Sequence, residues 1–296
     1  ALVVSIPLGY FGGIGAASRR GILFKGSNYL DAITHIDAVV FDKTSTLTRG
    51  VFRVQEVHPS GGLTADELVA WTAAAESGSN HPIARAIGEY AGQQALTLPA
   101  VRSTEERAGL GLRAMTDRGE LLVGKAALLA QNQVAYPEDI LHIPDTIVVV
   151  ALDGRYAGYL LLADEPKPDA SRAVTALHAL GIRNLCILSG DKSALVGKLA
   201  GQLGISRYFG DLMPEDKVRH IEEFQTKEHA RVAFVGDGLN DAPVLAASRV
   251  GIAMGGLGSD VAIEAADIIL QTDQPSKIAE AIRIGRRTRA VVWQNI

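Results

Sequence analysis

Short runs of hydrophobic residues that end in or beside aspartate recur along the chain. They lie at 38–42 (AVVFD), 184–191 (NLCILSGD) and 231–238 (RVAFVGDG), with related runs at 250–255 and 267–272. Because these runs are apolar throughout and do not alternate, they are typical of strands buried on both faces of a parallel sheet. The segments between them predict helices at about 167–180, 192–203, 214–227, 239–248 and 259–266.

Residues 51–158 follow a different pattern. Helices are expected near 64–77 and 82–94, and strand-like stretches separated by turns occupy 101–115, 119–125 and 146–152. This order predicts an α+β unit with an antiparallel sheet. The unit interrupts the parallel pattern after its first strand. We therefore expect an inserted domain whose two crossings are Gly50–Val51 and the stretch 153–165.

The two ends of the chain carry a pattern typical of membrane proteins. Residues 1–18 are uncharged and are followed at once by Arg19 and Arg20, which is the order found at the cytoplasmic end of a membrane helix. We expect 1–35 to be the end of such a helix with its linker, and 273–296 to be a basic helix leading into the next membrane segment. A buried core element at the start and an ordinary basic helix at the end are the alternative interpretation.

Composition narrows the classes of function. With one cysteine, Cys186, and seven scattered histidines, the chain has neither a disulfide framework nor a zinc-ligand spacing. The net charge of −4 provides no global basic field for nucleic acid. A mean hydropathy of +0.15 is high for an ordinary soluble protein, and the uncharged start of the chain accounts for part of it.

Carboxylates gather where the predicted parallel strands end. Asp42, Asp191 and Asp237 follow three of the apolar runs, and Asp241 comes one helical turn after Asp237. Ligands bind at the carboxyl ends of the strands in an open parallel sheet. Four carboxylates at that edge would repel one another, and a divalent cation such as Mg²⁺ would relieve the repulsion.

The residues after Asp42 supply groups that could surround a phosphoryl group. The loop KTSTLT begins with Lys43 and contains several hydroxyls, and Lys217 adds a further positive charge. An acid, a cation site, a lysine and hydroxyl donors together suit phosphoryl transfer. A carboxylate can also be the nucleophile itself, in which case an aspartyl-phosphate forms.

Four segments resemble, in this order, the signatures of P-type ATPases. They are DKTSTLT at 42–48, SGD at 189–191, PEDK at 214–217 and GDGLNDAP at 236–243. The resemblance implies an α/β fold in which a haloacid-dehalogenase-like parallel-sheet phosphorylation domain, residues 36–50 and 159–272, carries an inserted nucleotide-binding domain of antiparallel sheet at 51–158. It covers essentially the whole chain.

The resemblance also implies a role for individual residues. Asp42 is the phosphorylated aspartate, Lys217 stabilises the transferred group, and Asp237 is a magnesium ligand. The implied catalytic set is Asp42, Lys43, Thr44, Ser189, Gly190, Asp191, Lys217 and Asn240. The implied magnesium set is Asp42, the backbone carbonyl of Thr44, Asp237 and Asp241.

The inserted unit is similar to the nucleotide-binding domain of the heavy-metal branch of this family. That branch has a His-Pro pair and a glycine pair, which here are His81-Pro82, with Glu76 shortly before, and Gly109 with Gly111. The resemblance implies that these five residues bind ATP. A histidine at a helix start could stack on a purine, and glycines let a backbone approach a ligand closely.

The function implied is the ATP-hydrolysing catalytic unit of a heavy-metal cation-exporting ATPase that drives zinc, cadmium or lead transport. Both ends of the chain look more like the zinc/cadmium/lead group than the copper group, which is the alternative. The implied cofactor is Mg²⁺, the substrate is ATP, and nucleic acid is not a partner. The transported divalent cation would be held by membrane segments outside this chain, and the actuator and membrane domains would be further partners. The implied location is the cytoplasmic face of the cell membrane.

Three other classes of function compete with transport. A soluble haloacid-dehalogenase-like phosphatase typically has a second aspartate two residues after the nucleophile, where Thr44 stands here. A non-catalytic nucleotide-binding module gains support from Ser45, which replaces a glycine of the family loop. A structural piece without a ligand is the third alternative.

Overall fold

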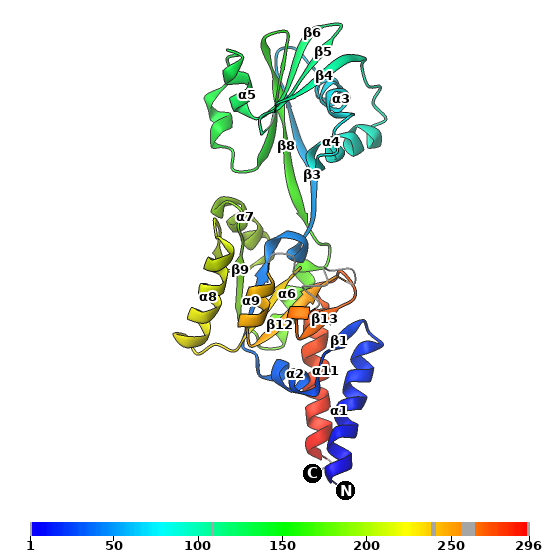
Figure 1. The fold of residues 1–296 in the computed structure, drawn as a ribbon, viewed down its shortest axis with the longest axis vertical. Helices are drawn as coiled ribbons and strands as arrows, with labels where there is room; N and C mark the ends of the chain where they lie inside the picture. The colour runs from blue at the N-terminus through cyan, green and yellow to red at the C-terminus, as the bar shows by residue number, and fades with distance from the viewer. Residues whose placement is uncertain (1, 108, 238–240, 256–263, 295–296) are drawn as a thin grey trace. The chain divides into compact units, whose positions relative to one another are not determined.

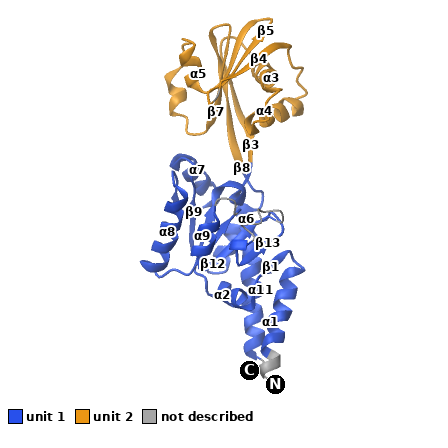
Figure 2. Ribbon diagram, in the orientation of Figure 1, with its two compact units in different colours: residues 1–50, 166–296 blue, residues 51–165 orange. Residues whose placement is uncertain are grey.

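The computed structural model describes residues 2–107, 109–237, 241–255 and 264–294. The chain divides into two compact units, which Figure 1 and Figure 2 show. Unit 1 is formed by residues 1–50 and 166–296, and unit 2 by residues 51–165. The second unit is thus inserted into the chain of the first.

Unit 1 is built on a seven-stranded sheet with the order β1-β13-β12-β11-β2-β9-β10. The strands are β1 (Ile22–Phe24), β2 (Ala38–Asp42), β9 (Asn184–Leu188), β10 (Arg207–Phe209), β11 (Val232–Gly236), β12 (Val250–Met254) and β13 (Ile268–Leu270). Neighbouring strands are parallel except β1 and β13, which pair antiparallel at one edge. All five apolar runs are strands of this sheet, which confirms the parallel-sheet prediction. The short strands β1 and β10 were not predicted.

The central strand β2 is buried on both faces, as its unbroken apolar sequence predicts. Val39 and Phe41 belong to the hydrophobic cluster on one face, and Ala38 and Val40 belong to the cluster on the other. Helices α6 (Ala170–Ala179), α7 (Ser193–Leu203) and α11 (Lys277–Gln294) contribute to the first cluster, whereas α8 (Pro214–Thr226) and α9 (Ala242–Ala247) contribute to the second. Successive side chains of a strand point to opposite faces, so each face of the sheet needs its own helices.

The predicted helices of unit 1 begin and end within a few residues of their expected positions. They are α6 (Ala170–Ala179), α7 (Ser193–Leu203), α8 (Pro214–Thr226) and α9 (Ala242–Ala247). Most of the helix expected at 259–266 lies outside the described residues.

Helices α1 (Leu2–Ser18) and α11 (Lys277–Gln294) lie side by side (Figure 1). A side chain at Gly13 would collide with Thr288, so the glycine lets the two helices approach closely. Arg20 donates a hydrogen bond to Glu280 at 2.8 Å and ties the end of α1 to α11. Within the described part of the chain, no helix has both the length and the apolar character needed to cross a bilayer. The short helix α2 (Ser27–Ala32) follows β1.

Unit 2 contains a six-stranded sheet with the order β3-β8-β7-β6-β5-β4. The strands are β3 (Thr48–Pro59), β4 (Val101–Arg107), β5 (Gly111–Thr116), β6 (Gly119–Gly124), β7 (Thr146–Leu152) and β8 (Arg155–Pro166). The pairs from β8 through β4 are antiparallel. The antiparallel α+β prediction is therefore confirmed, although the stretch expected at 101–115 is two strands.

Residues 153–165, expected to be the second crossing, are mostly a strand of the second sheet. Strand β8 occupies them, and it forms a hairpin with β7 across Asp153 and Gly154, both of which have positive φ angles of 49° and 72°. An Asp-Gly pair between two apolar runs is a strong hairpin signal. Because β8 belongs to the second sheet, unit 2 extends to Glu165, whereas its expected end was 158.

Helices cover both faces of the second sheet as well. Helices α3 (Ala65–Glu76) and α4 (Pro82–Gln93), both predicted, pack on the face that carries Val148 and Val150. The opposite face, with Val149, packs against α5 (Ala126–Gln131). Figure 1 shows these helices on the two sides of the sheet. Unit 2 therefore has a hydrophobic core of its own on each face.

Candidate functional site

A buried lysine joins two aspartates at the carboxyl ends of the strands of unit 1. Asp42 is the last residue of β2, and Asp241 immediately precedes α9. Lys217 Nζ lies 2.5 Å from Asp42 Oδ1 and 2.9 Å from Asp241 Oδ1. All three side chains are buried, with exposed fractions of 7% for Asp42, 8% for Lys217 and 2% for Asp241.

Local sequence explains how these three groups meet. Pro214 is the first residue of α8, and the Asp216 carboxylate accepts a hydrogen bond from the Met213 backbone N–H at 3.0 Å. This capping fixes the helix start and with it the first-turn position of Lys217. Gly236 leaves room for the Asp241 carboxylate, because a Cβ atom at this glycine would lie 2.6 Å from Asp241 Oδ2.

The cluster holds more negative than positive charge. Burial, and after it the carboxylates of Asp241 and Asp237, raise the pKa of Asp42 to about 7 against the opposing effect of the Lys217 ammonium. Burial by itself lowers the pKa of Lys217, but the two carboxylates beside it outweigh burial and leave the pKa raised. A further cation would relieve this excess of negative charge.

The Ser-Gly-Asp segment after β9 packs beside the residue that follows Asp42. Lys43 Nζ forms an ion pair with Asp191 Oδ2 at 2.5 Å. Ser189 is 2% exposed, and its hydroxyl accepts a hydrogen bond from the Asp191 N–H at 3.1 Å. A Cβ atom at Gly190 would lie 3.2 Å from the Leu212 carbonyl oxygen, which leaves little room for a side chain.

The loop after Asp42 is a single irregular turn, Lys43–Leu47. Thr44 is exposed, and Ser45 has a φ of 59°, in the left-handed region that favours glycine. Thr46 is fully buried, and its Oγ1 has no hydrogen-bond partner among the described residues. An orphaned buried hydroxyl is costly, so this atom is a candidate contact for a bound ligand.

The structure thus brings together most of the predicted catalytic set. The members that lie at one edge of the sheet are Asp42, Lys43, Ser189, Gly190, Asp191 and Lys217. Asp241, predicted as a magnesium ligand, lies beside Lys217, and Asp237, also a predicted ligand, acts on Asp42 through its charge. Asn240 lies outside the described residues. The part of the chain that the structure describes contains no group of three or more His, Cys, Asp or Glu side chains arranged to hold a metal ion.

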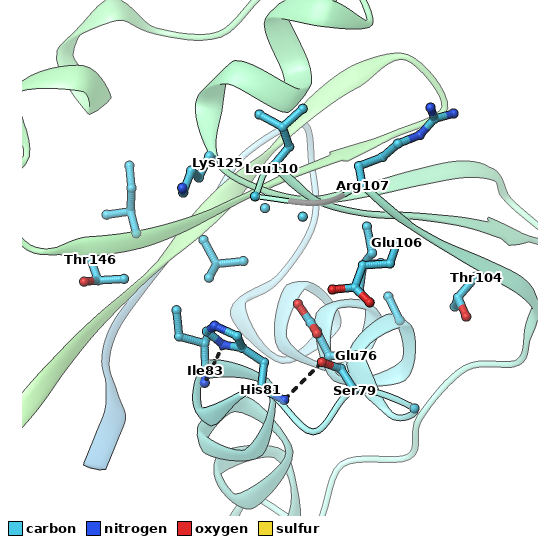
Figure 3. A pocket seen from close by; sticks show the side chains of 18 residues that line it. Glu76, Ser79, His81, Ile83, Thr104, Glu106, Arg107, Leu110, Lys125 and Thr146 are labelled. Carbon is cyan, nitrogen blue, oxygen red and sulfur yellow. Dashed lines mark hydrogen bonds between the residues drawn. The ribbon is translucent and has the colours of Figure 1, made fainter. Parts of the chain in front are cut away.

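A cavity of about 340 Å³ opens in unit 2 between α3, α4 and the sheet (Figure 3). Four of the five residues predicted to bind nucleotide line it, namely Glu76, His81, Gly109 and Gly111. Pro82, the fifth, is the first residue of α4 and does not line the cavity. Apolar side chains, among them Ile83, Leu112 and Val148, form much of the remaining wall.

His81 caps helix α4. Its Nδ1 accepts a hydrogen bond from the Ile83 N–H at 3.2 Å, and its own backbone N–H donates to the Ser79 hydroxyl at 3.2 Å. In a neutral imidazole that accepts through Nδ1, the proton lies on Nε2. The ring is therefore fixed by the helix start and retains one donor for a ligand.

Two carboxylates share the cavity wall. Figure 3 shows the Glu76 and Glu106 side chains near each other, and the charge of Glu106 acts on Glu76. Burial raises the pKa of Glu76, a hydrogen bond from Ser79 lowers it, and Glu106 raises it again, with a net upward shift. Glu106 was not predicted, because a glutamate on an exposed-looking strand has no signature in the sequence.

The two predicted glycines serve different purposes. Gly109 has a φ of 74°, and no atom of the described residues, its chain neighbours aside, lies within 4 Å of the position that a Cβ would occupy, so a ligand could approach its backbone from that side. A side chain at Gly111 would instead collide with the Val123 carbonyl oxygen and lie 2.6 Å from Gly124 Cα. Gly111 therefore lets β5 and β6 pair closely. Lys125 is exposed and also lines the cavity.

The chain is similar to known proteins along its whole length. A profile of the haloacid dehalogenase-like hydrolases matches residues 36–249. The chain is 50% identical over 302 residues to the cadmium, zinc and cobalt-transporting ATPase of Bacillus subtilis (strain 168), a match that covers 100% of this chain and 42% of the relative. It is 37% identical over 303 residues to the probable copper-exporting P-type ATPase V of Mycobacterium tuberculosis (strain CDC 1551 / Oshkosh), covering 100% of this chain and 39% of the relative.

Solved structures agree with these relatives. A zinc-transporting PIB-type ATPase in the E2.Pi state superposes with a TM-score of 0.90 at 36% identity over 99% of this chain and 48% of that chain. The catalytic domain of the CPx-ATPase CopB-B superposes with a TM-score of 0.72 at 32% identity over 91% of this chain and 98% of that chain. The chain thus spans less than half of the transporters it matches and nearly all of an isolated catalytic domain. It belongs to the haloacid dehalogenase-like hydrolases and, within them, to the heavy-metal P-type ATPases.

Proposed function

We propose that this chain is the catalytic segment of a heavy-metal cation-exporting P-type ATPase of the zinc/cadmium/lead group, phosphorylated by ATP at Asp42. The observation that carries the proposal is the buried Lys217 ammonium bridging Asp42 and Asp241 at the carboxyl ends of the strands. Such a cluster offers a nucleophilic carboxylate beside a fixed positive charge. The zinc-group assignment rests on the higher identity to the cadmium, zinc and cobalt transporter, 50%, than to the copper exporter, 37%.

The proposed reaction is a single phosphoryl transfer. An Asp42 carboxylate oxygen attacks the γ-phosphorus of ATP, a new O–P bond forms, and the bond to the β,γ-bridging oxygen breaks, releasing ADP. Lys217 neutralises charge on the oxygens of the transferred phosphoryl group. Lys43 and the Ser189 hydroxyl, which both contact Asp191, are proposed as further contacts of that group. The product is an acyl phosphate on Asp42.

The residues present also fit Mg²⁺. Mg²⁺ is held by one or two carboxylates together with substrate phosphate and water, so a dense ligand cluster is not required. The excess negative charge around Asp42 and the orphaned Thr46 hydroxyl both favour a cation and a phosphate at this edge. Asp42, the Thr44 carbonyl and Asp237 would hold the ion, with Asp241 beside them. When bound, Mg²⁺ would neutralise charge on the phosphate oxygens.

Nucleotide binding is proposed for the cavity of unit 2. An adenosine group would bury its apolar rings against the wall, with the His81 Nε2 proton and Glu76 as polar contacts and Gly109 admitting close backbone approach. Transfer requires the γ-phosphate to come within about 3–3.5 Å of the Asp42 carboxylate. We infer that the two crossing strands, β3 and β8, allow that approach by hinge motion.

The residue two positions after Asp42 favours a transport intermediate over a phosphatase. Thr44 stands where a haloacid-dehalogenase-like phosphatase would carry its second aspartate. Without a general acid or base there, hydrolysis of the aspartyl-phosphate is expected to be slow.

In the whole protein, the proposed partners of this segment are the transported divalent cation and the actuator and membrane domains. The proposed location of the segment is the cytoplasmic face of the cell membrane.

The test is covalent labelling. The chain is incubated with Mg²⁺ and ATP radiolabelled at the γ-phosphate, quenched in acid, and the label is challenged with hydroxylamine. We expect acid-stable, hydroxylamine-sensitive label that is absent from Asp42→Asn and unchanged in the control Asp139→Asn, whose exposed side chain lies in unit 2. Nucleotide binding without any label would instead support a non-catalytic module. Rapid release of free phosphate from small phosphate esters would support a phosphatase.

A further inference from the structure

Besides Lys43 and Lys217, unit 1 buries Lys167, which the proposed reaction does not use. Lys167 is the second residue of unit 1 after the return from unit 2, between Pro166 at the end of β8 and Pro168. Only 4% of the residue and 2% of its side chain are exposed. A buried ammonium is costly unless it is paired and hydrogen-bonded, so its partners indicate what it does.

Lys167 is attached to the Lys43–Leu47 loop at two points. Its backbone N–H donates to the Leu47 carbonyl oxygen at 2.8 Å, and its Nζ donates to the Ser45 carbonyl oxygen. The same Nζ forms an ion pair with Asp273 Oδ1, a short distance before α11. One side chain therefore joins the loop after Asp42 to the segment that leads into the C-terminal helix.

The loop needs such an anchor because its own geometry is irregular. Ser45 has a left-handed φ of 59°, and Thr44, with a φ of −74° and a ψ of 134°, is not helical either. The backbone therefore departs from helical geometry at the two residues that follow Lys43. The Ser45 carbonyl oxygen accepts a hydrogen bond from Lys167 Nζ. A strained backbone conformation of this kind persists when the surrounding structure holds it.

We propose that Lys167 is a positioning residue for phosphoryl transfer, which holds the loop after Asp42 in the conformation that receives the phosphate. This inference rests on the proposed function. Lys167 does not touch the reacting atoms; it acts through the Ser45 carbonyl and through Leu47. Lys167 directly follows β8, the strand by which the chain returns to unit 1. A shift of the backbone at the end of β8 would therefore move a residue that is hydrogen-bonded to the Lys43–Leu47 loop.

The position of Lys167 in unit 1 separates its effect from nucleotide binding. The cavity proposed for ATP lies wholly in unit 2. Loss of the Lys167 ammonium should therefore slow labelling of Asp42 and leave the ATP concentration at half-saturation unchanged. Displacing a reacting group by about 1 Å can cost about 10²-fold in rate, and we expect a loss of that order.

The test compares the variants Lys167→Met, Lys167→Arg and Asp273→Asn with the wild type. Methionine keeps the buried stem but removes the charge, whereas arginine keeps a donor for both oxygens. The control is Lys227→Met, an exposed lysine whose Nζ pairs with Glu223 at 2.8 Å on α8. We expect Lys167→Met to be labelled about 10²-fold more slowly, at an unchanged ATP concentration for half-saturation. Lys167→Arg should be labelled at nearly the wild-type rate, and Asp273→Asn at an intermediate rate. The control should be labelled as fast as the wild type.

A second readout keeps the inference separate from the proposed function. Amide hydrogen exchange is followed in residues 43–48 and is expected to accelerate in Lys167→Met but not in Lys227→Met. Wild-type rates of labelling in Lys167→Met, or unchanged exchange in this loop, would overturn the positioning role. So would a parallel loss of labelling, nucleotide affinity and thermal stability that arginine does not rescue, because that pattern means a structural role. If the wild type itself fails to label, the proposed function fails, and exchange still decides the role of Lys167.

Discussion

Ser45 holds a backbone conformation that its residue type disfavours. Its φ of 59° lies in the left-handed region, which costs a non-glycine residue about 1–2 kcal/mol. Glycine adopts this conformation freely but is more disordered in the unfolded chain, which costs about 0.4–1 kcal/mol. The strain of serine in the folded state and the extra disorder of glycine in the unfolded state therefore have opposite effects on the stability of Ser45→Gly, and the strain is the larger of the two.

We therefore predict that Ser45→Gly stabilises unit 1 by about 0.5–1 kcal/mol. Urea unfolding, followed at equilibrium, measures the change. A comparison replacement of Asp153→Gly, at a φ of 49° in the hairpin of unit 2, should show a smaller gain, because aspartate tolerates the left-handed region better than serine does. A loss of stability in Ser45→Gly would mean that the serine hydroxyl makes a bond worth more than the strain. Labelling of both forms shows whether the serine also limits phosphorylation.

Glu76 should make the stability of unit 2 depend on pH. Its pKa is raised by burial and by Glu106, so the folded state binds the proton more tightly than the unfolded state. The stability linked to this proton is present below the unfolded pKa and is lost as pH rises toward the folded pKa. We predict that Glu76→Gln raises the thermal midpoint near about pH 8 and changes it little near about pH 4.

The control for this prediction is Glu106→Gln. Removing its charge should lower the pKa of Glu76 and shrink the difference between the two pH values. An equal effect of Glu76→Gln at both pH values would contradict the assignment. If Glu76 binds ATP as proposed, the stabilised variant should also bind it more weakly, as often happens where a binding site is costly to stability.

At the residue scale, the sequence was enough to propose those site residues that lie next to the end of a strand or the start of a helix. Asp42 and Lys217 could be named because each follows a recognisable element boundary. Lys167 and Glu106 could not, because their importance comes from partners far along the chain, such as Ser45 and Asp273 for the lysine. A lysine between two prolines was the one available signal for Lys167.

At the scale of elements, the pairing of β5 with β6 depends on a glycine that looks like part of a ligand motif. Any side chain at Gly111 would strike the Val123 carbonyl oxygen, and the φ of 135° adds strain. Gly109 has no atom near the position of a Cβ, so a substitution there meets only its φ of 74°.

We predict that Gly111→Ala destabilises unit 2 by more than about 2 kcal/mol, whereas Gly109→Ala costs only about 1 kcal/mol. Thermal unfolding of the two variants measures the difference. Gly109→Ala should nevertheless weaken nucleotide binding if the backbone of Gly109 contacts the ligand. Equal destabilisation by both variants would contradict the separate purposes assigned to them.

Elements with a strong pattern of their own were predictable, and those defined by their partners were not. The buried strands β2, β9 and β11 follow from their unbroken apolar runs. Strands β1 and β10 are three residues each, too short for any periodicity, and they exist because β13 and β9 offer an edge. Strand β8 did carry a signal, the Asp153-Gly154 turn, which the crossing interpretation overlooked.

At the scale of the whole molecule, two units with separate cores share one chain. Each hydrophobic cluster draws its residues from one unit only. The order of strands and helices was enough to predict the insertion, because a parallel sheet and an antiparallel sheet leave different patterns. Its end at Glu165 was not predictable without knowing that β8 joins the second sheet.

We predict that residues 51–165, expressed alone, fold and bind ATP with the affinity of the full chain but take no phosphate label. The unit contains its whole sheet apart from the first residues of β3 and the last residue of β8, and it contains its cavity and both of its cores. Calorimetric titration with ATP and a thermal unfolding scan check the two halves of the prediction. An unfolded fragment, or one with much weaker affinity, would show that unit 1 contributes to the site.

The neighbouring positions of β3 and β8 also bear on how the chain folds as it is made. Unit 2 is one continuous stretch, whereas unit 1 stays incomplete until residues 166–296 have left the ribosome. Unit 2 can therefore fold first during synthesis. Once unit 2 has folded, β3 and β8 are neighbouring strands, and neighbouring strands lie about 4.8 Å apart. Residue 50, near the start of β3, and residue 166, at the end of β8, are therefore held near each other. The two halves of unit 1 then meet as if a short loop joined them, and the entropy of closing that loop is small.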